Sequence, residues 1–118
     1  MDLKELQSIQ RRFDLEYFPE FWRIMNYEDF LDRLEYITVA LAGEIGEFAN
    51  IVKKMRREYL HVNRERRDYL DTLKEELTDI FIYVLIASNL LDMDIEEWYT
   101  RKSNINRDRF KKYKDDNL

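Results

Sequence analysis

The near absence of glycine and proline is the feature that most constrains the fold of this chain. Its 118 residues include two glycines and one proline. A β-fold of this length needs many tight turns, and glycine and proline supply a large share of them for steric reasons. Leucine, glutamate, lysine and arginine, which all favour helix, are plentiful. The sequence therefore predicts an all-α fold.

Apolar residues recur at helical spacing in four segments. Asn26 and Asp94 stand where N-caps are expected, and Asp94 is followed by Glu97 in a capping-box pattern. An aromatic segment, residues 17–22, contains Pro19 and is expected to form a loop over the helices. Short connections predict one domain, 1–118, folded as an antiparallel four-helix bundle. The expected helices span residues 3 to about 17, 26 to 59, 68 to 91 and 94 to 112.

The second helix carries an acidic pair, Glu44 and Glu47, spaced i, i+3 on one face. The pair lies near the border of an apolar stripe, where charge needs an explanation. Both glycines, Gly43 and Gly46, adjoin it, although each costs about 1 kcal/mol relative to alanine in a helix interior. We therefore expect another group to approach this backbone closely. The inward stripe consists of Leu31, Leu34, Ile37, Leu41, Ile45, Phe48, Val52 and Met55.

The third helix carries a second acidic pair at the same spacing, Glu76 and Asp79, with Tyr83 one turn further on. In an antiparallel pair of helices, the four carboxylates can face one interior space. Four converging carboxylates would raise one another's pKa values unless cations neutralised them. Oxygen ligands without His or Cys favour Mg²⁺, with Mn²⁺ as an alternative. The inward residues of this helix are Leu70, Leu73, Leu77, Ile80, Phe81, Val84 and Leu85.

Basic and amide side chains share one face of the fourth helix, where Lys102, Asn106 and Arg109 are spaced i, i+4, i+7. Such groups suit phosphate oxygens, and Lys54 follows Glu47 by seven residues on its own helix. A phosphorylated substrate is therefore expected. The formal charge of −5 argues against a stable nucleic-acid partner.

The aromatic segment offers candidates for a base-binding surface. Trp22 is either an ordinary core residue or a wall against which a base stacks. Tyr83 is a second candidate, and Phe18 and Phe21 are equally open.

These motifs together resemble those of the MazG-like all-α nucleoside triphosphate pyrophosphohydrolases. The matching residues are Gly43-Glu-Ile-Gly-Glu47, Glu76-Leu-Thr-Asp79 after 28 residues, and Lys102 to Arg109, and the likeness covers roughly residues 34 to 110. The resemblance implies Mg²⁺-dependent cleavage of a nucleoside triphosphate between its α- and β-phosphates, in a homodimer or homotetramer. It also implies functional residues: metal ligands Glu44, Glu47, Glu76 and Asp79, and phosphate contacts Lys54, Lys102, Asn106 and Arg109. Among the carboxylates, Glu47 is our candidate for the base that deprotonates a metal-bound water.

Three other functions are alternatives for a chain with these features. A di-iron bundle needs two Glu-x-x-His motifs, and the chain offers only Glu58 with His61. A non-catalytic helical interaction module would not need four convergent acids. The same fold acting on another pyrophosphate-containing metabolite stays open, because function belongs to the site and not to the fold.

The lack of cysteine, of a signal peptide and of a long apolar run leads us to expect a cytoplasmic protein without a membrane partner.

Overall fold

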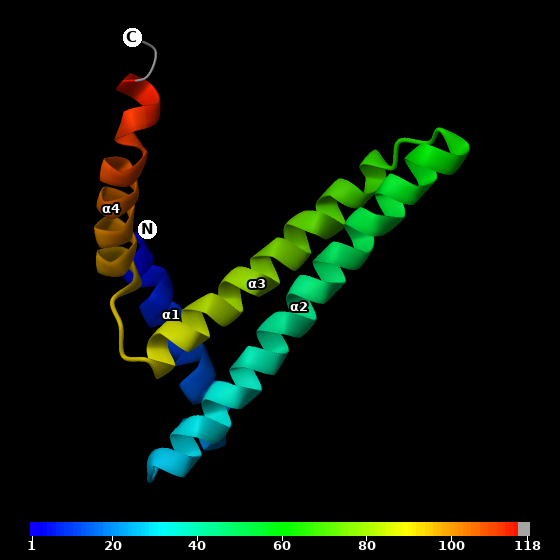
Figure 1. Ribbon diagram of the computed structural model, residues 1–118. Helices are drawn as coiled ribbons and strands as arrows, with labels where there is room; N and C mark the ends of the chain where they lie inside the picture. The colour runs from blue at the N-terminus through cyan, green and yellow to red at the C-terminus, as the bar shows by residue number, and fades with distance from the viewer. Residues whose placement is uncertain (116–118) are drawn as a thin grey trace.

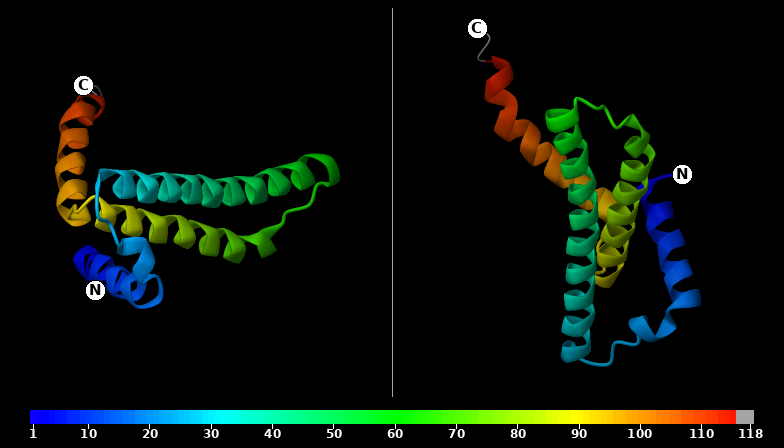
Figure 2. Two further views of the ribbon diagram at one scale, coloured as in Figure 1. Left: turned by 90° about the horizontal axis from the view of Figure 1, so that it is seen from below. Right: turned by 90° about the vertical axis from the view of Figure 1, so that its right-hand side faces the viewer.

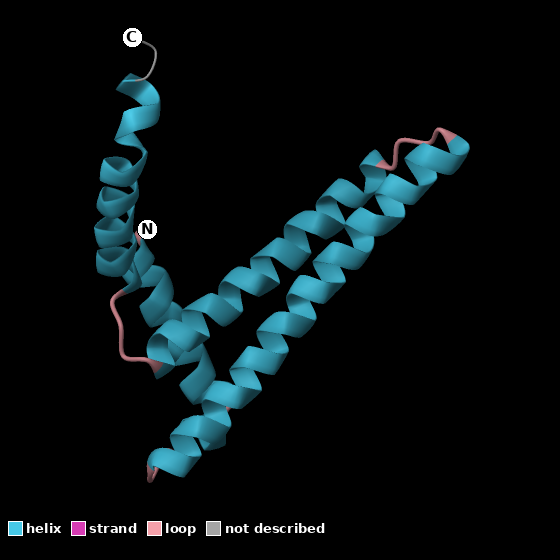
Figure 3. Ribbon diagram, viewed as in Figure 1, coloured by secondary structure: helices cyan, strands magenta, loops and turns pink. Residues whose placement is uncertain are grey.

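A computed structural model describes residues 1–115, and all regular structure within them is helical (Figure 3). The all-α prediction is confirmed. The four predicted helices form close to their expected bounds, and two short 3-10 helices join them. In chain order the elements are α1 (Leu3–Tyr17), η1 (Pro19–Trp22), α2 (Tyr27–Val62), η2 (Arg67–Tyr69), α3 (Leu70–Leu90) and α4 (Ile95–Asp115).

Helices α2 and α3 form a long antiparallel hairpin (Figure 1). Asn26 caps α2 as expected, since its side chain accepts a hydrogen bond of 2.8 Å from the backbone N–H of Asp29. The helix ends at Asn63, which adopts the left-handed conformation with φ 52°. Arg66 then pairs with Glu58 at 2.9 Å and with Asp68 at 2.7 Å. These contacts fix the turn from which α3 runs back along α2.

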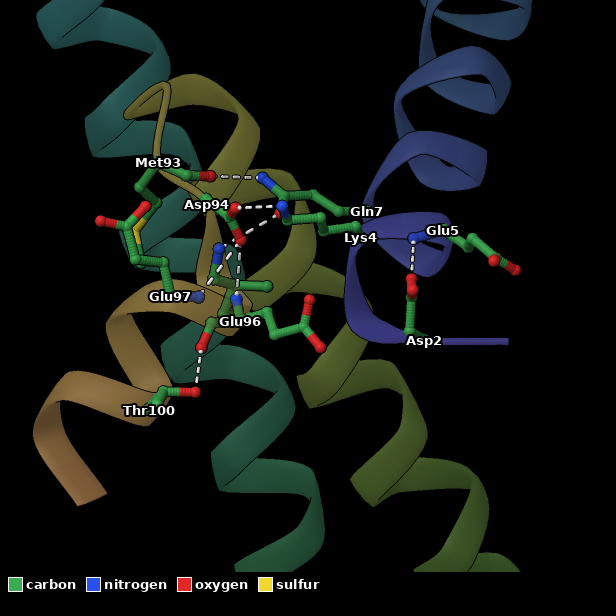
Figure 4. A network of polar contacts seen from close by, with 10 residues as sticks. Asp2, Lys4, Glu5, Gln7, Met93, Asp94, Glu96, Glu97 and Thr100 are labelled. Atoms are coloured by element: carbon green, nitrogen blue, oxygen red, sulfur yellow. Dashed lines mark hydrogen bonds and ion pairs between the residues drawn. The ribbon is translucent and has the colours of Figure 1, made fainter. Parts of the chain in front are cut away.

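Helix α1 packs across α3 and is tied to the connection between α3 and α4 (Figure 4). The side-chain amide of Gln7 donates to the carbonyl of Met93 at 2.6 Å, and Lys4 pairs with Asp94 at 3.1 Å. Asp94 also caps α4, because its Oδ1 accepts from the backbone N–H of Glu97 at 3.2 Å. One aspartate therefore positions both the start of α4 and the first turns of α1.

Helix α4 packs against α1 and leads away from the hairpin (Figures 1 and 2). The main helix contacts thus run from α2 to α3, from α3 to α1 and from α1 to α4. In residues 1–115, the four α-helices do not surround a common core.

The single chain is open and leaves much apolar surface in water. Its radius of gyration is 18.9 Å, against about 13.5 Å for a compact chain of this length. Its accessible surface is 9523 Å², against about 6,900 Å² for a folded monomer of this mass. Among the described residues, the apolar side chains that are buried are those of Ile37, Leu85 and Leu90.

Some residues that the helical pattern placed inward are exposed, and for them the prediction is wrong. Helix α2 packs mainly against α3, and α3 against α2 and α1, and these contacts cover only part of the broad apolar face of each helix. We call the exposed remainder the outer apolar stripes. They consist of Leu31, Ile45 and Val52 on α2, and Leu70, Leu77 and Phe81 on α3.

In the described part of the chain, no helix combines the length and apolar character that crossing a lipid bilayer requires.

Candidate metal centre

Three carboxylates meet between the two helices of the hairpin. Glu44 and Glu47 come from α2 and Glu76 from α3, and one oxygen of each lies within 4.8 Å of the others. The i, i+3 spacing puts the first two on one face of α2, and the antiparallel pairing brings the middle of α3 opposite them. The sequence pattern thus predicted this convergence.

Two of these carboxylates lack hydrogen-bond partners for buried oxygens. Oε2 of Glu44 and Oε2 of Glu76 are both buried and unpaired. Loss of solvation raises the pKa of Glu44, and repulsion from Glu47 and Asp79 raises it further. Loss of solvation also raises the pKa of Glu76, as do contacts with its acidic neighbours. Without a cation, the cluster therefore opposes its own ionisation.

The donor set of the cluster fits a hard divalent cation. It offers carboxylate oxygens alone, and its unpaired buried oxygens are the atoms that such an ion would satisfy. The described residues therefore provide a centre able to hold a metal of the Mg²⁺ class.

Asp79, the fourth predicted ligand, lies beside the cluster and not among the three closest carboxylates. It is exposed, it contributes to the raised pKa of Glu44, and it lines the same cavity as Glu44. Its role as a metal ligand stays a prediction.

The glycines beside Glu44 and Glu47 face open space. A Cβ atom added to Gly43 or Gly46 would meet nothing within 4 Å. The expected close approach to this backbone is therefore not made by any described part of the same chain.

A cavity of about 670 Å³ opens next to the carboxylates. Helices α1, α2 and α3 and the short η1 segment all contribute to its walls, and Glu44 and Asp79 lie on its side nearest the cluster. Trp22 and Tyr83, the candidates for base binding, both line it, as do Phe18 and Phe21. Desolvation in this wall raises the pKa of Tyr83. The structure thus gathers these aromatic residues beside the acidic cluster.

The η1 segment is held in place by Arg33 of α2. The Arg33 Nε donates to the carbonyl of Phe21 at 2.6 Å, and Nη2 donates to the carbonyl of Glu20 at 3.3 Å. The guanidinium carbon also lies 5.7 Å from the centre of the Phe21 ring. These contacts fix the segment that carries Trp22.

Asp14 of α1 is a cavity residue that the sequence reasoning missed. It is 4% exposed, and its Oδ1 accepts a hydrogen bond of 2.9 Å from the side-chain amide of Gln10. Its Oδ2 is buried without a partner, and loss of solvation raises the pKa of this carboxyl. A signal was available, because Asp14 follows Gln10 by one helical turn, on the face that Phe13 and Tyr17 border.

The basic residues expected to bind phosphate are not gathered at the cluster within one chain. Lys54 is exposed on α2, two turns after Glu47. Lys102 and Arg109 are exposed on α4 and Asn106 is half-buried there, but α4 leads away from the hairpin (Figure 1). Their role in phosphate binding stays a prediction.

Comparison with known proteins gives two matches. A family model described as the MazG nucleotide pyrophosphohydrolase domain matches residues 33–112. The "Gene 37 protein" of Mycobacterium phage L5 is 36% identical over 88 residues, which cover 74% of this chain and 71% of the phage protein. Its name gives no activity. No solved structure matches the chain. The matched range contains all four predicted acidic ligands but not α1 or η1, which form much of the cavity wall.

Proposed function

The chain belongs to the MazG nucleotide pyrophosphohydrolase family, and on this premise we propose that it hydrolyses nucleoside triphosphates in a Mg²⁺-dependent reaction. The products are a nucleoside monophosphate and pyrophosphate, from ribo- or deoxyribonucleotides. The observation that carries the proposal is the convergence of Glu44, Glu47 and Glu76 beside an aromatic cavity, with two buried oxygens left unpaired.

Magnesium is the metal that the donor set favours. The ligands are carboxylates, and Mg²⁺ commonly binds through a few carboxylates together with substrate phosphates. Mn²⁺ accepts the same ligands and is expected to substitute. Bound there, the ion would neutralise the carboxylates, orient phosphate oxygens and lower the pKa of a coordinated water.

Glu47 is assigned the role of general base. Among the three clustered carboxylates it is the exposed one, whereas Glu44 and Glu76 are half-buried and turn unpaired oxygens inward. A water oxygen attacks the α-phosphorus and its proton passes to Glu47. The bond from the α-phosphorus to the bridging oxygen breaks, and pyrophosphate leaves with the bonding electrons. Basic side chains stabilise the charge that develops on this leaving group.

The second part of the proposal is that two copies pair through their outer apolar stripes. The single chain exposes about 2,600 Å² more surface than a compact monomer of its mass, and obligate interfaces bury areas of this order. Pairing of two α2–α3 hairpins would complete a four-helix bundle. A homodimer is the smallest assembly that does so, and a homotetramer is a further step.

The proposed pairing of two copies also determines which chain's triphosphate each predicted phosphate-binding residue can contact. Lys54 belongs to the hairpin that carries the cluster, so it can act on the triphosphate of its own chain. Lys102, Asn106 and Arg109 lie on α4, which leads away from that hairpin. We propose that they contact the triphosphate bound by a neighbouring copy.

The test is pyrophosphate release from a panel of nucleoside triphosphates, with Mg²⁺ and with chelator. Single Gln or Asn variants of Glu44, Glu47, Glu76 and Asp79 should lose turnover while keeping the helical circular-dichroism signal. Glu75→Gln changes an exposed neighbour on α3 and serves as the matched control. Unchanged turnover in two of the four variants would overturn the site assignment. Absence of both Mg²⁺ binding and turnover would favour a non-catalytic interaction module, and Mg²⁺ binding without turnover would favour another pyrophosphate-containing substrate.

A further inference from the structure

Two buried polar atoms, each from a residue that lines the cavity, have no hydrogen-bond partner in the described part of the chain. They are Oδ2 of Asp14 and the indole Nε1 of Trp22. They come from α1 and η1, outside the range that matches the family. A buried polar group without a hydrogen bond is costly, so buried groups in folded proteins are nearly always paired. These two atoms therefore indicate a ligand that supplies their partners.

The two atoms have opposite requirements. An ionised carboxylate only accepts hydrogen bonds, and an indole N–H only donates one. The ligand must therefore present a donor to Asp14 and an acceptor to Trp22. The walls around them are largely aromatic, with Tyr36 and Tyr83 alongside Trp22, so the ligand is expected to be flat and able to stack. The volume of about 670 Å³ is within the usual range for small-molecule sites.

The position of the cavity relates this ligand to the acidic cluster. Glu44 belongs to the cluster and lines the cavity, and Asp79 lines it as well. A nucleotide with its phosphates at the cluster would therefore direct its base into the cavity.

We propose that the cavity binds the base of the nucleotide and selects bases that carry an exocyclic amino group, as cytosine, adenine and guanine do. This inference rests on the proposed function. The amino group donates to Oδ2 of Asp14, and an acceptor on the ring receives the indole N–H of Trp22. Uracil and thymine lack the amino group. Their ring N–H is flanked by two carbonyl oxygens, which a carboxylate repels.

Neighbouring residues hold both recognition groups in place. The amide of Gln10 occupies Oδ1 of Asp14 at 2.9 Å, which leaves Oδ2 for the ligand. Arg33 fixes the backbone of η1 through the carbonyls of Phe21 and Glu20. A site whose groups are held before the ligand arrives discriminates more sharply, because less ordering is required on binding.

The test compares dCTP with dUTP, which differ at position 4 of the base by an amino group against a carbonyl oxygen. A hydrogen bond to a charged group contributes about 1.5–3 kcal/mol, so kcat/KM for dCTP should exceed that for dUTP by at least about tenfold. Asp14→Asn introduces an amide that can donate to the carbonyl, and it should bring the ratio close to one, mainly through KM. Trp22→Phe should raise KM for both nucleotides. Glu16→Gln, an exposed change on the same helix, is the control and should leave the ratio unchanged.

Binding of the products dCMP and dUMP, measured by calorimetry without turnover, provides an independent readout. Equal binding and equal turnover of the cytosine and uracil nucleotides, unaffected by Asp14→Asn, would overturn the inference and leave the proposed function standing. Selective binding of dCMP without hydrolysis of any triphosphate would support the inference and overturn the proposed function. If Asp14→Asn does not fold, the dCMP and dUMP affinities of the unmodified chain and of Trp22→Phe decide the question.

Discussion

Replacing Leu77 by aspartate should dissociate the dimer that we propose while leaving each chain folded. Leu77 lies on the outer apolar stripe of α3 and is 57% exposed in the single chain. Burying a leucine side chain completely contributes about 1.5–3 kcal/mol, so covering its exposed part contributes about 1–2 kcal/mol per copy. A twofold interface contains the residue twice, which doubles the loss to about 2–3.5 kcal/mol. The dissociation constant should therefore rise by about 30- to 300-fold, and by more if the carboxylate is desolvated.

The assay is sedimentation velocity over a dilution series, with circular dichroism to monitor folding. The control is Val39→Asp, because Val39 is 72% exposed on α2 and lies off the outer stripes. The reasoning predicts a dimer for the unmodified chain and for Val39→Asp, and a monomer for Leu77→Asp at concentrations where the other two stay paired. It is refuted if the unmodified chain is monomeric, or if Leu77→Asp has the same dissociation constant as Val39→Asp.

Three further predictions address the site. Mg²⁺ should raise the Tm of the unmodified chain, because a ligand specific to the folded state adds about 2.7 kcal/mol to the free energy of unfolding at a hundredfold excess over its Kd. Glu76→Gln should remove this shift in Tm. Equal Tm shifts for the two chains in calorimetry would contradict the ligand assignment. A chain with Glu76→Gln and a second chain with Arg109→Ala should each be inactive alone. When the two are co-expressed, half of the dimers pair one chain of each kind and hold one intact site of two, so about a quarter of normal turnover should return. No recovery would mean that α4 does not act on the neighbouring copy. Asp14→Asn should stabilise the chain at neutral pH. Burial raises the pKa of Asp14 above its usual value of 3.8, so the protonated carboxyl contributes stability below pH 3.8, and this contribution is lost as the pH rises through the raised pKa. The gain, measured by urea unfolding, should shrink on acidification, and a gain independent of pH would contradict the burial argument.

Local chemistry made the helices and their starts predictable. Asn26 and Asp94 cap α2 and α4 as the sequence indicated, because an N-cap depends on residues within one turn of it. The convergence of Glu44, Glu47 and Glu76 was predictable for a related reason. Their spacing fixes the face of each helix, and antiparallel pairing of two long helices leaves few alternatives.

The features that the sequence did not reveal depend on tertiary packing. Periodicity identified the apolar faces that include Ile45 and Leu77, but it did not indicate that one neighbouring helix would cover only part of each face. The burial of Asp14 follows from the packing of α1 across α3, and an acidic residue in a charged helix gives little warning of it. The direction of α4 likewise depends on long-range contacts, those of Lys4 and Gln7 with residues 93 and 94.

The most direct test of the central claim is hydrolysis of dCTP in water enriched in ¹⁸O, with Mg²⁺ present, followed by mass spectrometry of both products. Attack of water on the α-phosphorus predicts one ¹⁸O atom in dCMP, unlabelled pyrophosphate, and loss of both products on addition of chelator. Label in pyrophosphate, release of orthophosphate with dCDP, or absence of hydrolysis of dCTP and the other nucleoside triphosphates by folded protein that binds Mg²⁺ would contradict the account.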